Sequence, residues 1–261
     1  MNKKEELASY LDFAKEVAVH AGSLLAKEHG KDHARHYKTR YDFANVMDQR
    51  TDKLIGSSIH KRFPDHDIIS EETKRRSNGS PWRWYIDPLD GTYNYTNGLD
   101  LFAVSIGLSY ESKPVVGIIY APLREELYWA SEGGGAFLNG SPINVSKERK
   151  LGGAFVGLEL GKFDPKAILP YYEKLFRGRR ILYAPSYASS TISLTFLASG
   201  KIHAYGALKL EPWDMAAGVI IVREAGGRVT DFYGKEWEEG DESFLAANPA
   251  LHKTLLKRLH T

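Results

Sequence analysis

The order of the predicted strands and helices constrains the fold of this chain more than any other sequence feature. Closely spaced apolar runs separated by turn residues predict strands at 66–70, 84–86, 102–110, 114–120 and 126–130. After about residue 150 strands alternate with helical patterns, with strands expected near 153–158, 181–183, 202–207, 228–231 and 243–247. The first half therefore reads as α+β and the second half as α/β.

Helical periodicity supplies the rest of the pattern. Apolar residues recur at helical spacing over residues 4–29, and Gly30 ends that predicted helix. Further helices are predicted at 46–62, 165–177, 190–199, 214–225 and 249–260. Because no flexible linker separates the halves, 1–150 and 151–261 are expected to pack as one unit.

Composition excludes several classes of protein. The 261 residues include no cysteine, which rules out disulfides and thiolate metal sites. The net charge of +2 without a block of like charge gives no indication of nucleic-acid binding. The sequence lacks both a signal-peptide pattern and the roughly 20 apolar residues of a membrane span. We therefore expect a cytoplasmic protein that binds neither nucleic acid nor membranes.

The stretch Asp87-Pro88-Leu89-Asp90-Gly91-Thr92 follows an apolar strand directly. Proline fixes φ and glycine permits a tight turn, so both carboxylates, the Leu89 carbonyl and the Thr92 hydroxyl can converge. Oxygen ligands without cysteine favour a hard cation such as Mg²⁺. A capped junction between strand and turn is the alternative reading of this motif.

Two distant acidic segments strengthen the metal interpretation. Glu71 and Glu72 follow the predicted strand 66–70, and Asp214 stands at the predicted start of a helix within Glu211-Pro212-Trp213-Asp214. Taken alone, Asp214 is most simply an aspartate that caps its helix. The three motifs together resemble the inositol monophosphatase superfamily, whose members are Mg²⁺-dependent, lithium-sensitive phosphatases.

The resemblance extends over nearly the whole chain. It includes Asp42–Asp48, Glu71-Glu72, DPLDGT, GGGAFLNG at 133–140 and PWDMAAG at 212–218. It implies a layered αβαβα sandwich and commonly a homodimer. Residues 1–150 would carry most metal ligands, and residues 151–261 would carry Asp214 and the substrate-selecting segments.

Carried over by position, the resemblance implies two Mg²⁺ ions and in some relatives a third. Glu71, Asp87 and the Leu89 carbonyl would bind the first ion, and Asp87, Asp90 and Asp214 the second.

The same resemblance implies roles around the attacking water. Glu71 and Thr92 would position and deprotonate this water, and Asp48 would accept a hydrogen bond from Thr92. The backbone of Gly91 and Thr92 would hold phosphate oxygens, and Asp90 and Asp214 would also contact the substrate. The implied reaction is in-line attack of water on a small phosphate monoester.

Three positions depart from the family pattern, and all concern substrate choice. Ala188 replaces a glycine in the segment whose small residues contact inositol hydroxyls, although Ser189 and Ser190 can still bind substrate. Ala207 stands where many inositol-selective members have a glutamate, and Asn45 replaces a threonine. The resemblance therefore implies the chemistry more firmly than it implies an inositol ring.

Several functions remain open at this point. A haloacid-dehalogenase phosphatase is excluded because its two aspartates are two positions apart, and here they are three apart. Fructose-1,6-bisphosphate, NADP⁺, histidinol phosphate and 3′-phosphoadenosine 5′-phosphate remain alternative substrates to inositol monophosphate. A silent regulatory or binding protein on the same fold is the alternative outside enzymes.

Two basic segments have no assigned role. The polar segment with Lys38 and Arg40 reads as a surface loop that could cover the metals, and Arg179-Arg180 could face the site or solvent.

Overall fold

The computed structural model describes residues 3–31, 35–37, 43–73, 77–159, 165–178, 181, 183–241 and 243–260, with only the backbone at 35–37, 43, 44 and 165. Lys38, Arg40, Arg179 and Arg180 lie outside the described residues.

The larger sheet has seven strands in the order β3-β4-β5-β6-β7-β8-β9, so neighbours in sequence are neighbours in space. Its strands are β3 (Asp67–Ser70), β4 (Trp82–Asp90), β5 (Ala103–Tyr110), β6 (Lys113–Ala121), β7 (Glu126–Ser131), β8 (Gly135–Leu138) and β9 (Ser141–Pro142). The β3–β4 pair is parallel and the other pairs are antiparallel. Asn139 and Gly140 both have positive φ and join β8 to β9, as expected for a hairpin turn at this dipeptide.

The smaller sheet has four strands in the order β10-β11-β13-β12. They are β10 (Val156–Leu158), β11 (Ala204–Leu208), β12 (Arg228–Thr230) and β13 (Ser243–Ala247). Only β10–β11 is parallel, so the alternating order of strands and helices in this half gives a mixed sheet. A separate pair consists of β1 (Arg35–Tyr37) and β2 (Phe43–Asn45).

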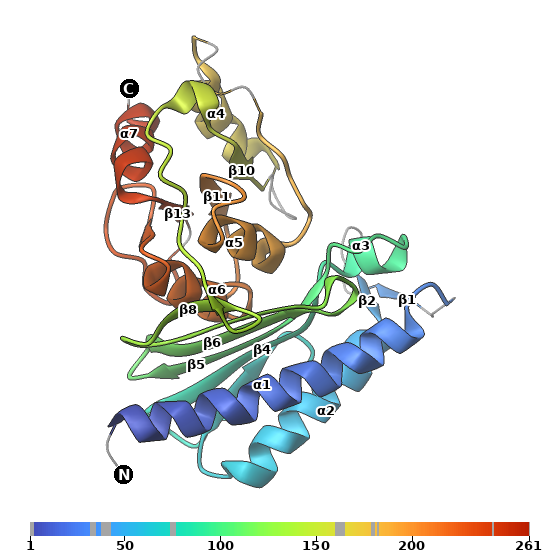
Figure 1. Ribbon diagram of the computed structural model, residues 1–261. Helices are drawn as coiled ribbons and strands as arrows, with labels where there is room; N and C mark the ends of the chain where they lie inside the picture. Colours follow the sequence, from blue (N-terminus) through green and yellow to red (C-terminus); the bar gives the residue numbers. More distant parts are fainter. Residues whose placement is uncertain are drawn as a thin grey trace.

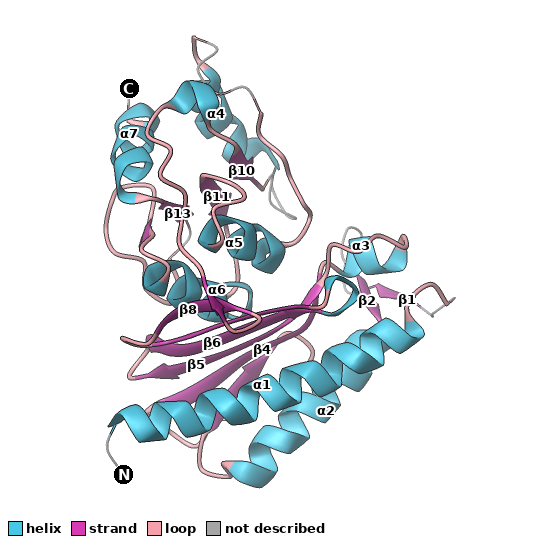
Figure 2. Ribbon diagram, in the orientation of Figure 1, coloured by secondary structure: helices cyan, strands magenta, loops and turns pink. Residues whose placement is uncertain are grey.

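Helices cover and separate the two sheets, as Figures 1 and 2 show. They are α1 (Lys3–Glu28), α2 (Val46–Arg62), α3 (Thr92–Thr96), α4 (Pro165–Phe176), α5 (Ser190–Ala198), α6 (Pro212–Glu224) and α7 (Pro249–Leu259), with 3-10 turns at Pro122–Arg124 and Leu151–Gly153. Helices α1 and α2 cover one face of the large sheet, α5 and α6 lie between the sheets, and α4 and α7 cover the small sheet. The predicted αβαβα sandwich is confirmed.

Helix α6 in the middle layer packs against both sheets. Buried side chains of α6, such as Val219 and Ile221, share one apolar core with Ile119 of the large sheet and Tyr205 of the small sheet. Burying this apolar surface from both sheets is the main favourable term that joins them. The position of α6 is therefore fixed from two sides.

Glycines allow α6 to lie directly against the large sheet. A Cβ atom at Gly117 of β6 would lie 2.4 Å from the Ala217 carbonyl oxygen, and one at Gly107 of β5 would lie 2.8 Å from the Ala216 Cβ. Real Cβ atoms essentially never come this close to a neighbour. Larger residues at either position would push α6 away from the sheet.

Element boundaries differ from the sequence expectations at a few places. Strand β4 continues through Pro88 to Asp90 and does not end before Asp87. The expected strand at 181–183 is reduced to an isolated bridge between Phe155 and Tyr183. The five-residue helix α3 was not predicted, because so short a helix has little periodicity to detect.

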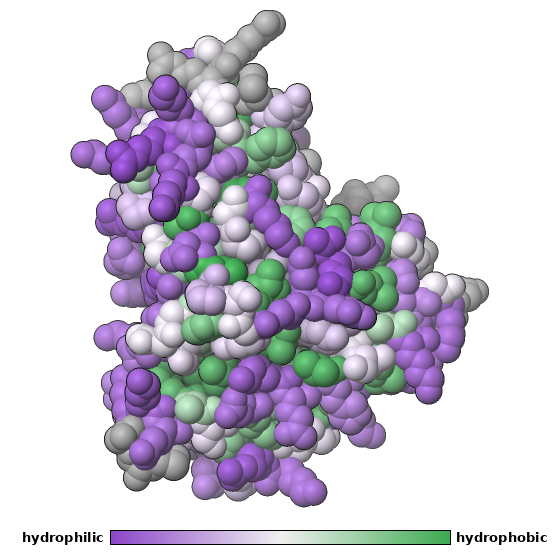
Figure 3. Space-filling model, in the orientation of Figure 1, coloured by the Kyte–Doolittle hydropathy of each residue, from purple (hydrophilic) through white to green (hydrophobic). Residues whose placement is uncertain are grey.

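The face drawn in Figure 3 is largely hydrophilic, with hydrophobic residues showing across its middle. No helix within the described ranges is both long and apolar enough to cross a bilayer.

Candidate metal centre

An irregularity at the end of β4 places two carboxylates together. Asp87 pairs with Ser105 and Asp90 with Ala103, so three steps along β4 oppose two steps along β5. In a regular strand, residues three apart point to opposite faces, and one inserted residue reverses that relation. The sequence suggested a turn here, whereas the structure brings Asp87 and Asp90 together through a bulge. Asp87 is buried, and its Oδ1 accepts a hydrogen bond of 3.1 Å from the Leu89 N–H.

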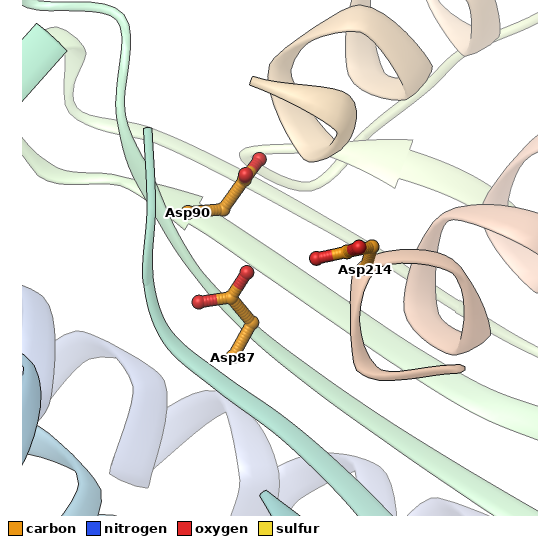
Figure 4. A group of neighbouring side chains, drawn as sticks. All are labelled: Asp87, Asp90 and Asp214. Carbon is orange, nitrogen blue, oxygen red and sulfur yellow. The ribbon is translucent and has the colours of Figure 1, made fainter. Parts of the chain in front are cut away.

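The third carboxylate comes from the other half of the chain. Asp214 is the third residue of α6, and its Oδ2 accepts a 3.0 Å hydrogen bond from the Glu211 N–H that precedes the helix. One oxygen from each of Asp87, Asp90 and Asp214 lies within 4.8 Å of the other two. Figure 4 shows Asp87 and Asp90 on one strand with Asp214 opposite them at the start of α6. Asp214 therefore caps the start of α6 and also completes an acidic cluster.

Asp90 is held in place by the first turn of α5. Its Oδ2 accepts hydrogen bonds from the Ser189 hydroxyl at 2.5 Å, the Thr191 N–H at 2.7 Å and the Thr191 hydroxyl at 2.5 Å. The positive end of a helix dipole also favours a carboxylate here. Three donors on one oxygen fix the carboxylate plane and its orientation. Thr191 was missed from the sequence because nothing local links it to a residue 101 positions away.

The Thr92 hydroxyl lies between two acceptors, 3.1 Å from Asp48 Oδ1 and 3.0 Å from the Leu89 carbonyl oxygen. The contact expected between Thr92 and Asp48 is thus present. Gly91 makes this arrangement possible, because its φ is 86° and a Cβ there would lie 2.6 Å from the Leu101 carbonyl oxygen.

The start of α2 positions Asp48. Asn45 caps the helix, accepting from the Met47 N–H at 3.0 Å, and the Asn45 N–H donates to Asp48 Oδ2 at 2.7 Å. Asn45 therefore acts as a helix cap where the family pattern has threonine. Burial, together with the Glu71 and Glu72 carboxylates, raises the pKa of Asp48 to about 8. A cation placed in this region would lower that pKa and favour the ionised carboxylate.

Glu71 lies beside the cluster and outside it. Its N–H donates to the Ile86 carbonyl at 3.2 Å, which continues the parallel β3–β4 ladder and places Glu71 next to Asp87 in register. Its carboxylate does not belong to the group of oxygens within 4.8 Å of one another. The structure therefore brings together three of the four predicted acidic ligands and leaves Glu71 adjacent to them.

The two serines predicted to contact substrate are both buried. The Ser189 side chain is buried and bonded to Asp90, and Ser190 is also buried. Ala188 has φ of 51°, a conformation that glycine adopts without strain, which explains why the family pattern has glycine there. Asn94 was missed from the sequence; its Nδ2 donates to the Leu101 and Tyr187 carbonyl oxygens at 2.6 and 2.8 Å and ties this segment to α3.

Ala207 is fully buried on β11. Beside it, Glu159 follows β10, and its Oε2 accepts a 2.8 Å hydrogen bond from the Ser186 hydroxyl. Burial, with a contribution from Asp90, raises the pKa of Glu159 to about 7. The sequence reading gave Glu159 no role, and only its neighbours in space reveal it.

The donor set of the cluster suits a hard divalent cation. All its ligand atoms are carboxylate oxygens, which Mg²⁺ prefers in proteins. Three carboxylates this close repel one another unless a cation or protons offset their charge. The arrangement can therefore bind a metal ion next to the Thr92 hydroxyl.

Comparison with known proteins gives the family. A sequence model of the Inositol monophosphatase family matches residues 6–261, and the chain belongs to that family. Over 258 residues it is 35% identical to the fructose-1,6-bisphosphatase/inositol-1-monophosphatase of Aquifex aeolicus, covering 97% of this chain and 96% of that protein.

Other relatives carry a different name. The chain is 32% identical to Nus factor SuhB of Pasteurella multocida, with 95% of each chain covered. The crystal structure of extragenic suppressor protein suhB from Bartonella henselae superimposes with a TM-score of 0.91 at 29% identity, covering 96% of this chain and 98% of that one. Names within the family therefore include both phosphatases and a Nus factor.

Proposed function

We propose that this protein is a Mg²⁺-dependent phosphomonoesterase that hydrolyses inositol monophosphate or a related small sugar phosphate. The observation that carries the proposal is the cluster of Asp87, Asp90 and Asp214, assembled from two distant parts of the chain. Membership of the inositol monophosphatase family supports the same activity.

Each residue near the cluster has a role in this proposal. Asp87, Asp90 and Asp214 would hold one Mg²⁺, and Glu71, Asp87 and the Leu89 carbonyl a second. When bound, the metal would lower the pKa of a water molecule and offset charge on the phosphate and the leaving oxygen. Because Asp214 comes from α6, a shared metal ion would link α6 to strand β4.

The chain's own groups would direct the attacking water. Glu71 would accept its proton, and the Thr92 hydroxyl would orient it toward the face of phosphorus opposite the leaving oxygen. Asp48 lies 3.1 Å from that hydroxyl and would fix its orientation. The backbone N–H groups of Gly91 and Thr92 would donate to phosphate oxygens.

Substrate panels test the activity and choose among esters. Mg²⁺-dependent release of phosphate would be measured from inositol 1-phosphate, fructose 1,6-bisphosphate, NADP⁺, histidinol phosphate and 3′-phosphoadenosine 5′-phosphate. We expect turnover of inositol 1-phosphate or a small sugar phosphate that stops when Mg²⁺ is chelated. A protein that binds Mg²⁺ yet releases phosphate from none of them would favour a regulatory role, as the name of the SuhB relatives suggests.

An Asp90→Asn variant tests the metal site directly. We expect turnover to be nearly abolished while circular dichroism and cooperative thermal unfolding show that the fold is retained. Asp12→Asn on α1 is the matched control, because the Asp12 side chain is 75% exposed and far along the chain from the cluster. Activity of Asp90→Asn equal to that of the control would refute the metal assignment.

A further inference from the structure

Glu159 extends the parallel strand pair at the edge nearest the cluster. Leu158 of β10 is in register with Gly206 of β11, and the Glu159 N–H donates to the Gly206 carbonyl at 3.1 Å. Glu159 therefore stands opposite Ala207, and residues in register on neighbouring strands point to the same face. Ala207 belongs to the core between the two sheets, so the Glu159 side chain is directed toward the middle layer.

The carboxyl of Glu159 is only half satisfied. Ser186 donates to Oε2, and the Tyr187 N–H also favours the ionised form. Oε1 is buried and has no hydrogen-bond partner among the described residues. A buried carboxyl oxygen without a partner is costly, and a water molecule or a ligand group would normally satisfy it.

A continuous segment connects Glu159 to the proposed metal site. Ser186 bonds Glu159 at one end of this segment, and Ser189 and Thr191 bond Asp90 at the other. Asp90 is the one charged residue that contributes to the raised pKa of Glu159. Tyr205 lies on the same face of β11 as Ala207. Burial raises the pKa of Tyr205, and the carboxylates of Glu159, Asp90 and Asp214 raise it further. Because only three positions separate Ser186 from Ser189, the Glu159 carboxyl lies on the small-sheet side of the acidic cluster.

We propose that Glu159 determines substrate specificity by accepting a hydrogen bond from a hydroxyl group of a polyhydroxylated phosphate ester. This inference rests on the proposed phosphatase activity. In the proposed function the phosphate is bound at the metal cluster, so the group that faces Glu159 belongs to the alcohol part of the ester. A neutral hydroxyl donor supplies the missing partner of Oε1, and the small Ala207 beside it offers no side-chain polar group in its place.

The test compares two esters that differ in their hydroxyl groups. Values of kcat and KM would be measured with saturating Mg²⁺ for inositol 1-phosphate and for p-nitrophenyl phosphate, which has no hydroxyl. For Glu159→Ala, we expect the ratio of the two kcat/KM values to fall about 10- to 100-fold, the effect of losing one hydrogen bond to a charged group. Glu159→Gln keeps an acceptor without the charge and should give a smaller fall.

Glu173→Ala on α4 is the matched control, since this glutamate is 77% exposed and lies in the same half of the chain. Thermal unfolding of each variant would show whether folding is retained. An equal loss of activity on both esters, or no change in their ratio, would overturn the role of Glu159. Absence of Mg²⁺-dependent hydrolysis in the unmodified protein would instead refute the proposed function, and this inference with it.

Discussion

Replacing Gly117 with alanine should displace the helix that carries Asp214. A Cβ at this position would lie 2.4 Å from the Ala217 carbonyl oxygen and 2.5 Å from the Ile220 Cγ2 atom. Ordinary contacts begin at 3.4 Å, so α6 or β6 must move by about 1 Å to admit one methyl group. Ala217 is only three residues from Asp214, and a shift of α6 therefore reaches the acidic cluster.

The lack of space for a methyl group at Gly117 sets the size of the expected effects on stability and turnover. Overpacking a core of this kind typically costs about 1–3 kcal/mol of unfolding free energy. A displacement of about 1 Å at a catalytic centre can lower turnover by about 100-fold. We therefore expect Gly117→Ala to unfold at lower urea concentration, to bind Mg²⁺ more weakly and to lose kcat/KM on its best substrate.

Gly56→Ala provides the control for the same change. Gly56 lies within α2, and a Cβ there would have nothing within 4 Å. Alanine is a better helix former than glycine by about 1 kcal/mol, so this variant should be as stable as the original or more stable. Equal urea midpoints and equal kcat/KM for Gly117→Ala and the unmodified protein would refute the close contact. Lower stability with unchanged activity would show that β6 yields and α6 stays in place.

Three further changes have distinct expected outcomes. Ala188→Gly should raise the unfolding free energy by about 0.5–1 kcal/mol, because it relieves a residue with φ of 51°; a lower urea midpoint would contradict this. Burial, with a smaller effect of Arg228, lowers the pKa of His252 from 6.5 to about 4, so the unfolded chain takes up the proton first. Neutral His252 therefore contributes its full stability above pH 6.5, and this stability is lost as the pH falls toward 4. Urea unfolding measured against pH should show a loss of about 1–3 kcal/mol in unfolding free energy over this range, and the loss should be absent in His252→Gln. Thr92→Val should lower kcat by about 100-fold or more while calorimetry finds Mg²⁺ binding retained; an unchanged kcat would remove Thr92 from the mechanism.

The sequence predicted features that depend on neighbours along the chain. Helix α2 has the predicted bounds, since a capping residue precedes it and Phe63-Pro64 follows it. The motif that holds Asp87 and Asp90 is local, whereas Asp214 was assigned only through the resemblance to the family, and the structure brings the three residues together.

Features that depend on pairing between distant segments were not predicted. The bulge in β4 exists only because Asp87 and Asp90 pair with β5, and proline and glycine in the motif suggested a turn. The bonds from Thr191 to Asp90 and from Ser186 to Glu159 join residues that are far apart in sequence. The Ser189 hydroxyl caps α5 and is also bonded to Asp90, and its contact with substrate stays a prediction.

The acidic cluster spans the contact between the α6 layer and the large sheet. Two unit charges 4.8 Å apart repel by about 3.5 kcal/mol at an effective dielectric constant near 20. A divalent ion bound there would turn this repulsion into cohesion, so ligand binding and folding would share one equilibrium. The melting temperature of this protein would then depend on the free Mg²⁺ concentration. A value measured with Mg²⁺ would describe the metal-bound protein, and a value measured with a chelator would describe the metal-free protein.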